Sequence, residues 1–249
     1  MGSRHHKGGG LLRWPVPRDQ QVILKLQEQI RQKEPSIRIQ AIKGLANIGG
    51  QVSVMILRDV VDVEKEKDKA VRIEAVKALG QIGSLPDSRI VLQVLNIPLV
   101  DPDDSVRKRT VQAYRNAGTA FASAYLGEAI RKDRSVSVRL EAVDMLKRIG
   151  TRFAIPPLSE ALRDRNESVR RMAADSLGKI GMLERRVANI LGAAFAEEKS
   201  TAVKLEIVGS LGMVREQAGL EYLKLAMSDR SPTIRKFATK VYSRIIAFQ

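Results

Sequence analysis

The sequence predicts an all-α fold, a right-handed α-solenoid of about seven stacked helix pairs. The main observation is a dipeptide of one β-branched and one basic residue that recurs along the 249-residue chain. Its seven copies are Ile37-Arg38, Val71-Arg72, Val106-Arg107, Val138-Arg139, Val169-Arg170, Val203-Lys204 and Ile234-Arg235. They recur roughly every 31 to 35 residues, a period typical of stacked two-helix units. No segment alternates with the two-residue period of a strand for long enough to predict a sheet.

Apolar residues follow each dipeptide with the period of a helix. Relative to the basic residue, most copies carry apolar residues at the third, seventh and tenth positions after it, which lie on one face of an α-helix. The residues at the seventh position are Leu45, Leu79, Tyr114, Leu146, Leu177, Leu211 and Tyr242. Each unit is therefore expected to contain one amphipathic helix, here named helix B, with a buried stripe.

Glycines mark the expected ends of these helices. Five of them stand eleven positions after the basic residue: Gly49, Gly83, Gly118, Gly150 and Gly181. A left-handed residue commonly ends a helix, and glycine adopts that conformation at no steric cost. The last two units carry Arg215 and Ile246 instead.

A second helix, named helix A, is expected before each helix B. The seven segments are 20–32, 52–61, 88–99, 121–131, 155–163, 185–196 and 218–227. Pro156-Pro157 fits the start of one of them, because the first turn of a helix needs no N–H donors. A single helix pair cannot bury both of its faces, so the units are expected to depend on their neighbours.

The expected organisation is a flexible tail over residues 1–17 followed by one solenoid over residues 18–249. The units are expected at about 18–50, 51–84, 85–119, 120–151, 152–182, 183–216 and 217–249. Trp14, in the tail, is expected to cover the first unit or to anchor in a partner's groove. Ile245, Ile246 and Phe248 have no polar capping helix behind them, so that end tolerates exposure, packs on a second copy or is covered by a partner.

An acidic residue six positions before the basic residue completes the repeat. It is present as Glu66, Asp101, Asp133, Asp164, Glu198 and Asp229, and the first unit has Gln32. Together with the Val-Arg pair and the glycine, this pattern resembles the HEAT repeat family, in particular its bacterial and archaeal HEAT-like branch of phycobilin-lyase type, over about residues 18–249. The resemblance implies a ladder of acidic and basic side chains along the solenoid, a structural role for the repeated arginine, and a protein-binding scaffold. Fold alone does not specify the partner.

Composition disfavours several classes of enzyme. The chain has no cysteine, and its two histidines, His5 and His6, lie in the tail. The His-Glu pairs of metal-dependent HEAT hydroxylases are therefore missing, and no repeat contains the tryptophan expected for a HEAT-like DNA glycosylase cleft. Asp101-Pro102-Asp103-Asp104 is interpreted as a capping turn rather than a cation site. No cofactor or metal is expected, although a phycobilin-lyase-like subunit stays open as an alternative implied by the resemblance.

No run approaches the roughly 20 apolar residues of a membrane-spanning helix, and residues 1–10 show no hydrophobic leader. The expected location is cytoplasmic, without integral membrane association. The oligomeric state is left open.

Positive charge is the main functional signal: 43 Lys and Arg stand against 28 Asp and Glu, a net charge of +15. Five positions before the repeated basic residue, in the turn between helices A and B, six of the seven units carry another cation. These are Lys33, Lys67, Arg134, Arg165, Lys199 and Arg230, here named the basic ridge; Pro102 is the exception. Stacking should place them along one edge, about 10 Å apart. They are either solvated residues that complement helix dipoles or a track for phosphates, an acidic protein or anionic lipid.

The concave face is expected to be formed by helices B and to carry mixed charge. Its basic residues are Lys43, Lys77, Arg109, Arg148, Lys179, Lys240 and Arg244. Its acidic residues are Glu74, Glu141, Asp144, Asp175 and Glu206. Few aromatic residues are available to stack on bases. The leading hypothesis is a non-catalytic scaffold for a protein with acidic patches, and the first alternative is a nucleic-acid-associated module that uses the ridge.

Overall fold

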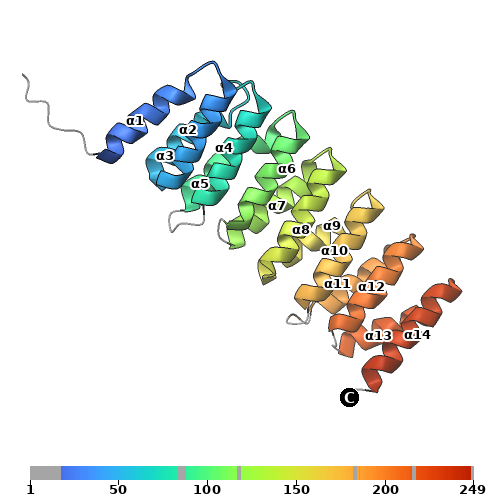
Figure 1. The fold of residues 1–249 in the computed structure, drawn as a ribbon. Coiled ribbons are helices and arrows are strands. Elements are labelled where there is room, and N and C mark those ends of the chain that lie inside the picture. Colours follow the sequence, from blue (N-terminus) through green and yellow to red (C-terminus); the bar gives the residue numbers. More distant parts are fainter. Residues whose placement is uncertain are drawn as a thin grey trace, which may run out of the picture.

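The computed structural model describes residues 18–83, 88–116, 119–181, 184, 186–214 and 217–247. Within these residues the chain forms fourteen α-helices and three short 3-10 helices, with no strand. The helices stack into one elongated array that runs from α1 at one end to α14 at the other (Figure 1). The expected all-α solenoid is confirmed. The tail with Trp14 lies outside the described residues, and the unit boundaries stay predictions.

Helices A and B alternate along the chain. Helices A are α1 (Arg18–Ile30), α3 (Gly50–Val60), α5 (Ser88–Leu95), α7 (Thr119–Lys132), α9 (Ile155–Ala161), α11 (Arg186–Glu197) and α13 (Gln217–Ala226). Helices B are α2 (Pro35–Ile48), α4 (Lys69–Ile82), α6 (Asp104–Ala113), α8 (Val136–Ile149), α10 (Glu167–Ile180), α12 (Thr201–Val214) and α14 (Pro232–Ile246). The 3-10 helices are η1 (Ile97–Val100), η2 (Tyr114–Asn116) and η3 (Arg152–Ala154).

The helix expected at 88–99 is shorter than predicted. Helix α5 ends at Leu95, and Pro98 lies in the first turn of η1. Proline has no N–H for the hydrogen bond that a continuing α-helix would need. The chain therefore changes to a separate 3-10 turn before unit three's helix B.

The core lies between the layer of helices A and the layer of helices B and contains buried residues of both. Each helix B packs on the next, from α2 against α4 through to α12 against α14. The stripe residues are buried in the first six units: Leu45, Leu79, Tyr114, Leu146, Leu177 and Leu211. Tyr242 in α14 is half-buried because no further helix B covers it. The predicted helical register is confirmed by this burial.

Two of the glycine predictions are wrong. Gly49 and Gly150 do have positive φ, 67° and 64°. Gly83 and Gly181 are right-handed, with φ of −63° and −68°. At Gly181 the reason for glycine is space, because a Cβ would lie 2.6 Å from Cγ1 of Val187. Gly118 lies outside the described residues.

Close approach between helices B also depends on glycine. A Cβ at Gly178 in α10 would lie 2.7 Å from Cβ and 2.9 Å from Cα of Ser210 in α12. At Gly209 in α12 the nearest atoms, in the ring of Phe237, are 3.9 Å away. Gly178→Ala is therefore expected to lower the free energy of unfolding by about 1–3 kcal/mol through overpacking. Gly209→Ala should raise it by about 0.5–1 kcal/mol, since alanine is the better helix former. Urea unfolding of both variants checks this difference in sign.

Candidate binding surfaces

Helices B are joined by arginine forks that reach from one unit to the next. In the rung formed by Arg72, Nε donates to Oδ2 of Asp101 at 2.7 Å and Nη2 donates to Oδ1 at 3.1 Å. Nη1 of the same guanidinium donates to the main-chain oxygens of Glu66 and Lys67, both at 3.0 Å. Asp101 Oδ1 also accepts the N–H of Asp103 at 2.9 Å. Each rung therefore fixes the turn of its own unit and the turn of the following unit.

Four further arginines form the same two-atom contact with a carboxylate of the following unit, and Lys204 forms a single ion pair. The other pairs are Arg38–Glu66, Arg107–Asp133, Arg139–Asp164, Arg170–Glu198 and Lys204–Asp229. The ladder implied by the resemblance is present, with one addition. The carboxylate comes from the following unit, while the acidic residue of the same unit contributes its main-chain oxygen.

The contacts at the Arg170 and Arg107 rungs favour the charged forms of Glu198 and Arg107. Burial alone raises the pKa of Glu198, but the hydrogen bond from Arg170 and the N–H groups of Ser200 and Lys199 outweigh it, so this pKa lies below its usual value. The hydrogen bond to Asp133 raises the pKa of Arg107. These arginines and lysines are therefore committed to holding units together and are not available to a partner.

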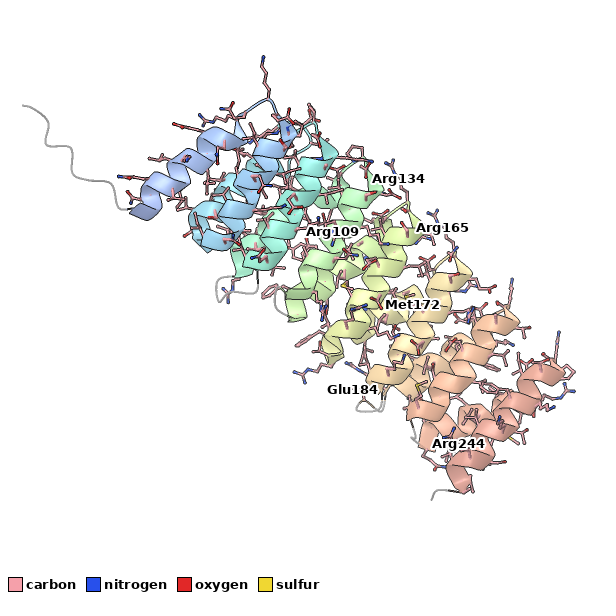
Figure 2. All side chains as sticks on the ribbon, viewed as in Figure 1. Arg109, Arg134, Arg165, Met172, Glu184 and Arg244 are labelled. Atoms are coloured by element: carbon pink, nitrogen blue, oxygen red, sulfur yellow. The ribbon has the colours of Figure 1, made fainter. Side chains whose placement is uncertain are left out.

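The six cations of the basic ridge lie on the exposed turns between helices A and B. Lys33, Lys199 and Arg230 make no ion pair with any residue in the described ranges. Arg134 Nη2 donates to the main-chain oxygen of Pro102 at 2.9 Å, and Arg165 Nη2 points to that of Arg134 at 3.4 Å. Figure 2 shows Arg134 and Arg165 projecting from the same edge of the array.

Within the described residues, one ridge cation faces a carboxylate. Lys67 lies 3.4 Å from Oε2 of Glu64, and both side chains are exposed. Cations that flank the ridge are paired: Lys65 with Asp59, Arg131 with Glu128 and Glu160, and Arg163 with Glu197. The ridge is thus a row of positive charge that its own surroundings leave largely uncompensated.

Grooves between neighbouring helices A lie beside the ridge. A groove of about 570 Å³ between α9 and α11 is lined by Leu162, Ile190 and Ala194 and bordered by Lys199. One of about 460 Å³ between α7 and α9 is bordered by Arg134 and Arg165. Another, of about 760 Å³, lies between α1 and α3.

Sequence reasoning missed these grooves. The available signal was the pair Val52 and Met55, apolar residues on the exposed face of a helix A, which line the groove between α1 and α3. The apolar period alone does not tell how far neighbouring helices A separate.

On the concave face, three of the seven predicted cations face a carboxylate. Lys77 pairs with Glu74 at 2.9 Å and Arg148 with Asp144 at 2.6 Å. Burial raises the pKa of Asp175, but hydrogen bonds from Lys147 and Lys179 outweigh this effect, so the pKa lies below its usual value.

The remaining predicted concave cations lie apart from these pairs. Lys43, Arg109, Lys240 and Arg244 make no ion pair within the part of the chain that the structure describes. Figure 2 places Arg109 on the helix-B face near the middle of the array and Arg244 at its α14 end. The two predicted surfaces therefore differ: the ridge positions are basic except at Pro102, whereas the concave face carries both basic and acidic residues.

Among the described residues, no group of three or more His, Asp or Glu side chains is placed to hold a metal ion. No described helix is both long and apolar enough to cross a membrane.

Solved structures with the same architecture are distant in sequence. Cex1p matches 90% of this chain and 52% of its own length at 13% identity, with a TM-score of 0.59. YibA of E. coli matches 90% and 82% at 20% identity and a TM-score of 0.55. Drosophila melanogaster Mini spindles TOG3 matches 78% and 95% at 15% identity and a TM-score of 0.55. These likenesses show the fold alone.

The complex of CpcE and CpcF of phycocyanin lyase from Nostoc sp. PCC7120 also matches, at 18% identity over 98% of both chains. Its TM-score is 0.47, so the structural similarity is too low to support an argument about activity. No curated protein matches the chain. Residues 23–115 and 123–204 match the family model of HEAT repeats. The ladder, the alternating helices and this match over most of the chain show that it belongs to the HEAT repeat family.

Proposed function

We propose that the protein is a non-catalytic interaction scaffold that binds an acidic surface of another protein along its basic ridge. The observation that carries this proposal is the contrast between its two charged surfaces. Among the described residues, six of the seven ladder cations and three of the seven concave cations face a carboxylate, whereas only one of the six ridge cations does. Such uncompensated charge attracts an oppositely charged partner and raises its association rate.

The grooves beside the ridge favour a protein partner over a nucleic acid. The groove between α9 and α11 has apolar lining residues and lies beside Lys199. A partner's aliphatic side chains could enter this groove while a neighbouring carboxylate of the partner contacts Lys199. Protein interfaces commonly combine an apolar centre with a charged rim. The ridge and its grooves together therefore fit an acidic segment that also carries apolar residues.

A nucleic acid is the alternative occupant, and the row of exposed cations is the observation that favours it. If the six ridge side chains neutralise six phosphates of a duplex, log K against log salt should fall with a slope of about −5. A glutamate-rich peptide with interspersed leucines should bind with a shallower slope, because part of its affinity comes from apolar contact.

The test is a salt titration of both probes by fluorescence anisotropy. We expect the peptide to bind near physiological salt and a mixed-sequence duplex to bind only at low salt. Tight duplex binding with the steep slope would replace the protein-scaffold proposal by the nucleic-acid one. Failure of both probes to bind at any salt would remove the ridge as a binding surface.

A further inference from the structure

Arg235 in α14 occupies the basic position of the ladder in the seventh unit. Its guanidinium makes the main-chain contacts of a rung but faces no carboxylate among the described residues. Its Nη1 donates to the main-chain oxygens of Asp229 at 2.9 Å and Arg230 at 3.0 Å, as in the other units. The residues that the structure describes place no carboxylate against its Nε and Nη2, and the side chain is exposed. The guanidinium is therefore held in the rung geometry without the acidic group that all preceding rungs have.

The outer face of α14 is polar where the other helices B are apolar. Thr239 stands four positions after the repeated basic residue and is exposed. At that position the other six units carry fully buried residues: Ile42, Val76, Val111, Val143, Ala174 and Val208. Thr239 donates to the main-chain oxygen of Arg235 at 2.9 Å, and Ser243, one turn further on, is also exposed. Of the apolar residues that end the sequence, Ile246 is exposed, Ile245 is half-buried and Phe248 lies outside the described residues.

Helix α14 as a whole is also strongly basic. Helix α14 contains Arg235, Lys236, Lys240 and Arg244 and no acidic residue. None of these four cations makes an ion pair inside the described ranges. Ile246 and Phe237 add exposed apolar surface at its margins.

We propose that the outer face of α14 binds the acidic N-terminal turn of a helix from another protein, with a partner carboxylate completing the Arg235 rung. The six internal rungs define the chemistry required. At the Arg170 rung, Glu198 accepts from Nε at 2.7 Å and Nη2 at 3.1 Å, and also accepts the N–H of Ser200 at 2.7 Å. The partner segment therefore carries Asp or Glu three residues before the first residue of a helix, in an acidic stretch that complements the four cations. Bidentate arginine–carboxylate pairs are geometrically selective.

A second copy of this chain is a poor occupant. In head-to-tail stacking the first unit would face α14, and its residue at the acidic position is Gln32. A glutamine offers a neutral amide oxygen in place of two carboxylate oxygens. The proposed site is separate from the basic ridge and does not require it.

A peptide with the sequence of residues 195–212 supplies a defined probe, because it contains Glu198, Ser200 and the start of α12. It is titrated into isotope-labelled protein while the Nε–H resonance of Arg235 is followed by NMR. We expect that resonance to shift, and a peptide with Glu198→Gln to bind roughly tenfold more weakly. Arg235→Gln in the protein should abolish the difference between the two peptides. Equal binding of both peptides to the unmodified protein, or no binding of either, would overturn the proposal.

Two controls separate the alternatives. A protein with Glu at Lys33, Lys67, Arg134, Arg165 and Lys199 should keep the response of Arg235, so loss of ridge binding and loss of this site are distinguishable. Sedimentation velocity detects self-association. A concentration-dependent dimer that disappears in Arg235→Glu would assign the face to a second copy and overturn the proposal of a different partner.

Discussion

Asp101→Ala is expected to lower the free energy of unfolding by about 3–5 kcal/mol, the largest effect of any single ladder substitution. The side chains of Arg72 and Asp101 are only 4% and 1% exposed. Removing the carboxylate leaves a buried guanidinium without its counter-charge and frees the N–H of Asp103. Equilibrium unfolding in urea, followed by circular dichroism, measures the change.

The matched control is Lys69→Ala. Lys69 pairs with Asp103 in the neighbouring turn but is 61% exposed, so its loss should cost at most about 1 kcal/mol. A double variant, Arg72→Met with Asp101→Leu, should recover most of the stability because it removes both buried charges. If Asp101→Ala cost no more than Lys69→Ala, the ladder would not be holding the units together.

Leu177→Ala is expected to destabilise the protein by about 2–5 kcal/mol. Leu177 is fully buried in α10, at the seventh position of the repeat, and alanine would leave a cavity between helices that cannot fully close. Leu225→Ala is the control, because Leu225 in α13 is 54% exposed and should change stability by about 0.5 kcal/mol or less. Equal effects at the two sites in urea unfolding would contradict the assigned register.

The repeat pattern predicted the fold because the same physical constraint acts in every unit. A helix pair must bury one stripe, so Leu45, Leu79 and Leu177 recur at one register position and are all buried. The structure departs from the predicted pattern where local hydrogen bonding or packing determines the conformation of a single residue. Pro98 divides a predicted helix, and Gly181 relieves crowding against Val187 instead of adopting positive φ.

Pairing between surface side chains was harder to predict. The sequence shows that Arg72 and Glu66 recur together, but only the stacking of turns shows that the fork reaches Asp101 in the next unit. Likewise, Lys77 and Lys199 look equivalent as exposed cations. Glu74 lies beside the first, while nothing in the described chain neutralises the second. Charge balance on a surface depends on neighbours that a repeat pattern does not specify.

The central functional claim is that binding depends on the ridge and not on positive charge in general. A ridge variant carries Glu at five ridge positions: Lys33, Lys67, Arg134, Arg165 and Lys199. A control variant carries Glu at five concave positions outside α14: Lys43, Lys77, Arg109, Arg148 and Lys179. Both variants change the net charge equally, and circular dichroism confirms that each is folded.

The most direct test is the affinity of these two variants and the unmodified protein for the glutamate-rich peptide at one physiological salt concentration. The proposal predicts about 100-fold weaker binding by the ridge variant and a change within about tenfold for the control. Equal losses in both variants, or a larger loss in the concave variant, would contradict it.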